Sequence, residues 1–249
     1  MTPHDQFKAE CEREIAAQGA NEKLAAATQQ WMKAANQAKY SYHFSWLGRP
    51  IIQYPQDIVV IQEIIWSVQP DLIIETGIAH GGSLILSASM LELNAACGGN
   101  ATSEVFAIDI DIRSHNRAAI EAHPMSKRIT MLEGSSIAPD IVALVRSRAQ
   151  HRKRILVFLD SNHTHDHVLA ELDAYASLIS VGSYCVVFDT IIEEFPPGSF
   201  PNRGWDRGNN PKTAVYSWLR SHPEFQIDKT IQNKLMITVA PDGFLRRVR

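Results

Sequence analysis

The sequence has little cysteine, no long hydrophobic run and no excess of positive charge. Its three cysteines, Cys11, Cys97 and Cys185, lie far apart, which argues against a disulfide framework and favours a reducing compartment. No apolar stretch approaches the roughly 20 residues of a membrane span. The first residues, Met1 to Asp5, are polar, so we expect no secretory signal. These absences predict a cytoplasmic protein without a membrane partner.

The net charge of -3 offers no basic surplus to neutralise phosphates, so we expect no nucleic-acid partner. A hydrophobic content of 45% and a charged content of 20% are typical of a globular protein. A chain of 249 residues suffices for one large domain, or for one domain with an extension.

Residues 1–48 are predicted to form a helical extension, because apolar residues recur at helical spacing over 7–15 and 22–38. The aromatic stretch 40–48 ends in a Gly-Arg-Pro turn, so we place the main domain at 49–249. This stretch either packs against the core or a second subunit, or contributes to a substrate pocket.

From residue 55 onwards, helices alternate with short, nearly continuous apolar strands. Such strands are typical of a parallel sheet buried on both faces, and right-handed crossovers then make it doubly wound. After a loop over 191–210, we expect a helix from Pro211 and strands over 225–231, 235–239 and 244–248. The predicted strands of the alternating part are 71–75, 105–109, 128–132, 155–160 and 183–189.

An acidic residue ends or directly follows each of the five predicted parallel strands, and ligands of such sheets bind beyond these ends. The first end runs Glu75-Thr-Gly77-Ile-Ala-His-Gly81-Gly-Ser83, where the glycines permit close backbone approach and Ser83 can cap a helix. Its spacing differs from dinucleotide and phosphate loops. A glutamate before the first glycine suits a cationic ligand, and S-adenosylmethionine carries an ammonium, a sulfonium and a carboxylate. We predict that Glu75, Gly77, Gly81 and Ser83 bind its methionine part, unless the loop is only a structural turn.

The second and third strand ends provide candidates for the nucleoside. Asp109 is predicted to accept hydrogen bonds from the ribose hydroxyls, whereas Asp111 is the weaker alternative. Ser135 and Ser136 either approach the adenine or cap the helix that follows.

The fourth and fifth strand ends predict a metal site. Asp160 and Asp189 would project from neighbouring strands about 4.8 Å apart, and two close carboxylates repel unless a cation or proton lies between them. Mg²⁺ takes such oxygen ligands, and Asn162, Thr190 or Glu193 could add another. His163 is the candidate base toward an acceptor hydroxyl, whose pKa the metal would lower. The alternative is that Asp160 caps a helix and His163 is a solvated loop residue.

Two other functions remain open at this point. The run His-Thr-His-Asp-His over 163–167 is similar to the H-x-H-x-D-H motif of metallo-β-lactamase-type zinc hydrolases, but it is one residue short. Its later members fall in a predicted helix and point in different directions. A non-catalytic accessory subunit that binds S-adenosylmethionine is the second alternative. The 191–210 loop is too long for a simple connection, so we expect it to cover an acceptor pocket, with Trp205 either stacking on substrate or anchoring the loop.

Taken together, five stretches resemble the cephalosporin hydroxylase / rhamnosyl O-methyltransferase family: 75–83, 107–111, 159–165, 186–193 and 208–215. The resemblance implies a class I, Rossmann-like methyltransferase sheet of seven strands, mostly parallel with an antiparallel C-terminal strand. It also implies an oligomer, a Mg²⁺-assisted methyl transfer to a hydroxyl of a sugar or secondary metabolite, metal ligands at Asp160 and Asp189, and a base at His163. One departure is Phe188, where relatives often carry a second acid beside Asp189.

Overall fold

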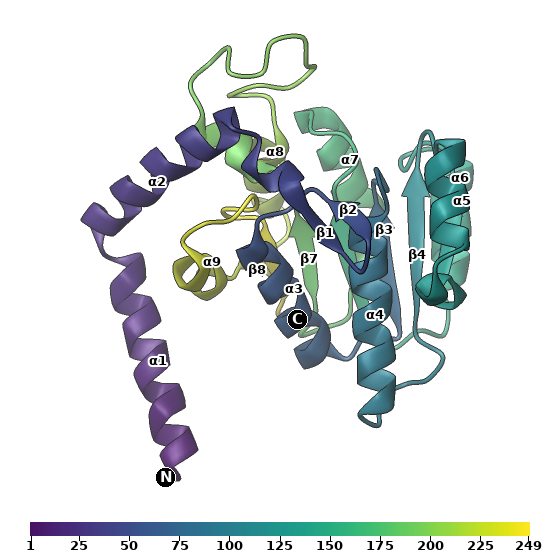
Figure 1. Ribbon diagram of the computed structural model, residues 1–249, viewed down its shortest axis with the longest axis horizontal. Coiled ribbons are helices and arrows are strands. Elements are labelled where there is room, and N and C mark those ends of the chain that lie inside the picture. Colours follow the sequence, from purple (N-terminus) through teal and green to yellow (C-terminus); the bar gives the residue numbers. More distant parts are fainter.

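The computed structural model describes residues 1–249, which form an α/β fold with a helical N-terminus (Figure 1). The helices are α1 (Pro3–Gly19), α2 (Glu22–Gln37), α3 (Pro55–Val68), α4 (Gly82–Ala96), α5 (Ser114–Glu121), α6 (Pro139–Ala149), α7 (His165–Tyr175), α8 (Pro211–Leu219) and α9 (Lys229–Leu235). The strands are β1 (Phe44–Trp46), β2 (Arg49–Ile51), β3 (Leu72–Thr76), β4 (Glu104–Asp109), β5 (Ile129–Glu133), β6 (Ile155–Leu159), β7 (Tyr184–Val187), β8 (Phe225–Ile227) and β9 (Phe244–Arg247). Four short 3₁₀ helices are η1 (Tyr40–His43), η2 (Pro124–Arg128), η3 (Ala176–Leu178) and η4 (Thr190–Glu194).

The main sheet has seven strands in the order β5-β4-β3-β6-β7-β9-β8. The strands β5, β4, β3, β6 and β7 pair in parallel, which confirms the doubly wound sheet. β9 pairs antiparallel with β7 and with β8, as the resemblance implied. The strand order reverses between β3 and β6, and this is where a parallel sheet opens a crevice beyond its strand ends.

Alternate residues of each strand pack on opposite faces of the sheet, as the pleat requires. Ile73 packs with α3 and α4, whereas Leu72 and Ile74 pack with α6, α7 and α8. All residues of β3 and β6 are buried, because helices cover both faces. The central strands β3 and β6 therefore hold their carboxyl ends in fixed positions, at the upper edge of the sheet in Figure 1.

The N-terminal helices confirm the two predicted helical segments. α1 begins with a capping box in which Thr2 and Asp5 exchange hydrogen bonds, and it contacts α9 while burying none of its own residues. α2 leads into a cluster of aromatic rings formed by Trp31, Tyr40 and Tyr54. The hairpin β1–β2 follows, and the predicted domain boundary at 48/49 falls within its turn.

The predicted strands at 225–231 and 235–239 are wrong over most of their length. Only Phe225–Ile227 forms a strand, and residues 229–235 form α9. Asp228 caps this helix by accepting a hydrogen bond from Thr230 N–H, and Ile231 and Leu235 have helical i, i+4 spacing. Helix α5 and the hairpin β1–β2 were not predicted at all.

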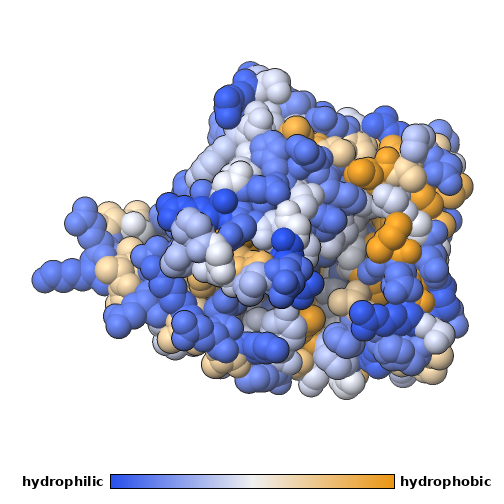
Figure 2. All heavy atoms as spheres, turned by 90° about the horizontal axis from the view of Figure 1, so that it is seen from above, coloured by the Kyte–Doolittle hydropathy of each residue, from blue (hydrophilic) through white to orange (hydrophobic).

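Seen from above, the surface at the strand-end edge is largely hydrophilic, with hydrophobic side chains gathered toward the right of the view (Figure 2). None of the helices combines the length and the apolar character that crossing a lipid bilayer requires.

Candidate active site

A cavity of about 340 Å³ lies beyond the carboxyl ends of β3, β6 and β7. Its lining joins residues far apart in the sequence: the glycine loop after β3, the ends of β6 and β7, the segment between α2 and α3, and the loop after η4. The predicted residues Gly77, Ser83, Asp109, Asp160, His163 and Asp189 all line it. The fold therefore brings these six residues to one cavity, whereas the predicted cofactor residues Glu75, Gly81, Ser135 and Ser136 do not line it.

The glycine loop can form only because Gly77 has no side chain. Its φ is +89°, and a Cβ there would lie 2.1 Å from the carbonyl oxygen of Asp160. Its N–H donates to the carbonyl of Ile108, so the loop is tied to the neighbouring strand β4. Gly81, at φ +83°, is the N-cap of α4 and supplies no capping side chain. The first N–H groups of α4 are therefore left to bind a negative group.

Replacing Gly77 with alanine is expected to destabilise the protein by about 2–4 kcal/mol, because backbone strain adds to a clash with backbone atoms that cannot move aside. Gly98→Ala is the matched control, since Gly98 also has a positive φ of +92° but open space around its missing Cβ. The control should cost only about 1–2 kcal/mol of strain. Urea unfolding measures both, and equal losses would show that the contact with Asp160 does not limit this position.

Glu75 lies at the end of β3 and is 2% exposed. Its carboxyl group accepts hydrogen bonds from the hydroxyls of Ser83 and Ser87, and no basic side chain pairs with it. Burial raises its pKa to about 8, and the charge of Asp160 adds to this rise. Glu75 lines a small recess adjoining the cavity rather than the cavity itself. A cation there would compensate the buried charge.

The raised pKa makes stability depend on pH. Between the ordinary pKa of 4.5 and about 8, folded Glu75 keeps its proton while the unfolded chain releases it. Stability should therefore fall as pH rises through this window, by up to about 1.4 kcal/mol per pH unit, and should carry no such penalty below it. Glu75→Gln, which keeps an acceptor for the two serines, should gain stability relative to the natural chain from pH 5 to 8. Urea unfolding at several pH values tests this, and a constant difference would contradict it.

The predicted nucleoside residues separate into two groups. Asp109 lines the cavity, and its carboxylate accepts hydrogen bonds from the N–H groups of Ile78 and Asp111. The bond from Ile78 thus holds the glycine loop against the end of β4. Ser135 and Ser136 do not line the cavity, and the Ser136 hydroxyl lies 3.1 Å from Nε2 of His167 instead.

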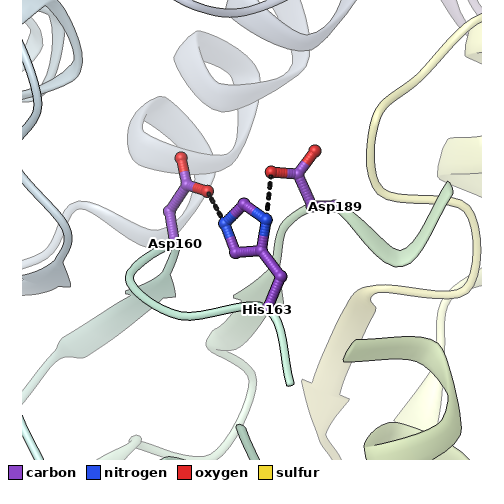
Figure 3. A group of neighbouring side chains, drawn as sticks. All are labelled: Asp160, His163 and Asp189. Carbon is purple, nitrogen blue, oxygen red and sulfur yellow. Dashed lines mark ion pairs between the residues drawn. The ribbon is translucent and has the colours of Figure 1, made fainter. Parts of the chain in front are cut away.

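Asp160, His163 and Asp189 form a compact group in which one donor atom of each lies within 4.8 Å of the others (Figure 3). The imidazole lies between the two carboxylates, with Nε2 3.6 Å from Asp160 Oδ1 and Nδ1 3.2 Å from Asp189 Oδ2. β6 and β7 are direct neighbours, which places both acids at the same edge as predicted. Asp189 has a φ of 54°, a left-handed turn that ends β7.

This arrangement changes the protonation of His163. Burial by itself lowers its pKa, but Asp189 and Asp160 outweigh that effect and raise the pKa to about 9. Burial also raises the pKa of Asp160 to about 6. The ordinary pKa of histidine, near 6.5, therefore does not apply to His163 while its imidazole alone compensates two carboxylates. Apart from the imidazole, no cation lies between the carboxylates of Asp160 and Asp189. Two such carboxylates are a donor set that a hard divalent ion fits.

The other oxygen donors considered for the metal are used elsewhere. Asn162 accepts from Thr164, and the Thr190 hydroxyl donates to the carbonyl of Pro241. Glu193 accepts from Gly208 N–H and the Asn210 side chain, so it holds the loop before α8. Phe188 turns its ring toward Phe158, 6.1 Å away between centroids. None of these groups takes the place of the second acid that relatives often carry beside Asp189.

The histidine run does not form a zinc site. His165 Nδ1 lies 2.8 Å from the Thr213 hydroxyl, whereas His167 Nε2 lies near Ser136 and Ser161. Only His163 belongs to a group of potential ligands, and its partners are Asp160 and Asp189. The three histidines point apart because α7 begins at His165.

Another part of the cavity wall is rich in aromatic residues, which two segments of the chain supply. Ser41 and Tyr42 enter from η1, and Phe200, Arg203 and Trp205 enter from the loop after η4. The Trp205 ring lies 4.7 Å from the His163 ring, with the Arg203 guanidinium on it at 5.2 Å. The loop thus borders the candidate base, as the prediction of a pocket cover requires. Gln53 and Tyr54 also line the cavity, and they were not predicted because no local motif in the sequence marks them.

The family model described as rhamnosyl O-methyltransferase/CmcI matches residues 38–248. The chain belongs to this family. Among curated members of the rhamnosyl O-methyltransferase/CmcI family, the rhamnosyl O-methyltransferase of Mycobacterium tuberculosis (strain ATCC 25618 / H37Rv) is 32% identical over 193 residues, which covers 75% of this chain and 71% of the relative. That of Mycobacterium leprae (strain TN) is 28% identical over 206 residues, or 82% of each chain.

A solved CmcI structure described as Mg-SAM has the same fold, with a TM-score of 0.55 at 18% identity over 84% of this chain and 77% of that one. The family match begins at residue 38, so α1 and most of α2 lie outside it. The matched part contains every predicted site residue.

Proposed function

We propose that this member of the rhamnosyl O-methyltransferase/CmcI family transfers a methyl group from S-adenosylmethionine to a hydroxyl of a sugar or secondary metabolite, with help from Mg²⁺. The observation that carries the proposal is the joining of two features in one cavity. The glycine loop and the group of Asp160, His163 and Asp189 line the same cavity. Relatives named rhamnosyl O-methyltransferase and the CmcI structure with Mg-SAM support the same reaction.

The residues present fit the cofactor and the metal. Glu75 is a buried acid without a cationic partner, and the N-terminus of α4 has no side-chain cap. These two features suit the ammonium and the carboxylate of the methionine part. Asp109 lines the cavity, where its carboxylate would accept hydrogen bonds from the ribose hydroxyls. Asp160 and Asp189 supply carboxylate oxygens, which are the ligands that Mg²⁺ prefers.

When bound, S-adenosylmethionine supplies the methyl group and Mg²⁺ lowers the pKa of the acceptor hydroxyl. The residues of this chain position both and move one proton. Asp160 and Asp189 would hold the metal, whose charge would replace that of the imidazole between the two carboxylates and so lower the pKa of His163. Neutral His163 then takes the hydroxyl proton on a ring nitrogen. Phe200 and Trp205 border the acceptor side and reduce access of water. Such positioning raises the rate, because the methyl donor and the acceptor hydroxyl react while bound side by side rather than after a chance encounter.

Calorimetric titration of S-adenosylmethionine with and without Mg²⁺ tests the proposal, followed by a screen of hydroxylated sugars and polyketides with methyl transfer read by mass. We expect cofactor binding, and methyl transfer that stops when the metal is chelated. A protein that binds the cofactor but ignores Mg²⁺ and methylates nothing would be an accessory subunit. Co-purified zinc with no cofactor binding would favour the hydrolase.

Several predictions from the sequence stay predictions. They are the division into an extension (1–48) and a methyltransferase domain (49–249), the homo-oligomer and the cytoplasmic location. The free cysteines Cys11, Cys97 and Cys185 support the last of these. The exposed Phe7 on α1, a helix that buries none of its own residues, supports an oligomer contact.

A further inference from the structure

A recess of about 20 Å³ adjoins the cofactor side of the cavity, and a volume of this size holds one water molecule or a group of similar size. We name it the inner recess. The residues that it shares with the main cavity are Ile51, Gln53, Ser83, Asp160 and Phe188. The other polar residues of its lining are Asp57, Glu75 and Ser87.

Gln53 is the unexplained member of this lining. It lies between β2 and α3, is 6% exposed, and lines both the inner recess and the cavity. Its Oε1 is buried and accepts no hydrogen bond. Buried carbonyl oxygens almost always have a donor, because the group loses its water on burial. The side chain is thus an acceptor held in place without its partner.

The charges around the recess indicate which partner fits. Asp57 is already used, because it accepts hydrogen bonds from the Thr238 hydroxyl and Val239 N–H. Glu75 accepts only from serine hydroxyls and has no cationic partner. A carboxylate would be repelled by these acids, and a sulfonium has no N–H to donate. A small cation with several N–H donors satisfies both Glu75 and Gln53.

We propose that Gln53 binds the α-ammonium group of S-adenosylmethionine, with its Oε1 accepting one N–H beside the carboxyl group of Glu75. The bound cation favours the ionised form of Glu75, which then provides the opposite charge. This inference rests on the proposed function and adds a cofactor-binding residue to it. It also orients the methionine part, because the ammonium enters the inner recess and the carboxylate is left for the uncapped N-terminus of α4.

The test compares Gln53→Met with Gln56→Met in the full-length protein. Methionine keeps the length of the side chain and removes the acceptor. Gln56 is a matched control, because its Oε1 is also buried without a partner but it lines neither the cavity nor the recess. Calorimetry is done with S-adenosylhomocysteine, and with an analogue of it in which hydrogen replaces the α-amino group. We expect Gln53→Met to bind S-adenosylhomocysteine about tenfold to hundredfold more weakly and to bind the analogue almost unchanged. Gln56→Met should behave like the natural chain toward both.

Other results would overturn the inference in distinguishable ways. Unchanged affinity of Gln53→Met for S-adenosylhomocysteine would end it and leave the proposed function intact. Equal weakening toward both ligands, or a loss of Mg²⁺ binding instead, would assign Gln53 another role. If Gln53→Met does not fold, the natural chain still decides, because equal affinity for the two ligands would show that no residue recognises the ammonium. A natural chain that binds neither ligand would refute the proposed function itself.

Discussion

Replacing His163 with alanine is expected to lower kcat by about 10²- to 10⁴-fold, the usual contribution of a general base. The imidazole is the only ring nitrogen donor in the group with Asp160 and Asp189, and it faces the acceptor side beside Trp205. Cofactor affinity should change little, since the side chain of His163 contacts Asp160, Asp189 and Trp205 rather than the glycine loop. Steady-state kinetics and calorimetry with S-adenosylhomocysteine measure the two quantities separately.

His165→Ala is the matched control for this prediction. His165 belongs to the same histidine run, but its ring faces Thr213 and does not line the cavity. The control should keep kcat within about twofold, as expected when a residue makes no contact with the reacting groups. Similar losses in both variants would indicate a structural effect of the run. An active His163→Ala would remove the proposed base.

Replacing Asp160 with asparagine is expected to weaken Mg²⁺ binding by about a hundredfold or more, because it removes one of only two carboxylates at the site. Phe188 makes this loss larger than it would be in a site with a third acid, since no nearby residue compensates. Asp189→Asn should have a similar effect. Calorimetric titration of Mg²⁺ in the presence of S-adenosylhomocysteine measures both variants.

Asp166→Asn provides the control, because Asp166 is exposed at the start of α7 and lines no part of the cavity. It should bind Mg²⁺ as the natural chain does. If Asp160→Asn and Asp189→Asn both retain the metal affinity of the natural chain, the pair does not hold the ion. His163 would then compensate the two acids as a purely structural ion-pair partner.

Much of the site could be predicted because its signals are local. The glycine loop, and the acids that follow apolar strands, are visible in short stretches around Gly77, Asp160 and Asp189. Sheet topology then brings these strand ends to one edge, so their meeting follows from the strand order. Parts of α9 were predicted as strand because that prediction left out the cap at Asp228 and the i, i+4 spacing of the two apolar residues, Ile231 and Leu235.

The parallel sheet, the glycine loop and the acidic strand ends could be predicted from residue order, since hydrophobic period and turn chemistry act over a few residues. Which side chains meet across the chain depends on the folded arrangement. In the folded chain Ser136 contacts His167 and Glu193 holds a loop. His163 lies between two carboxylates that raise its pKa. Gln53 is buried beside Glu75 without a donor. These outcomes depend on distance and burial, which residue order alone does not specify.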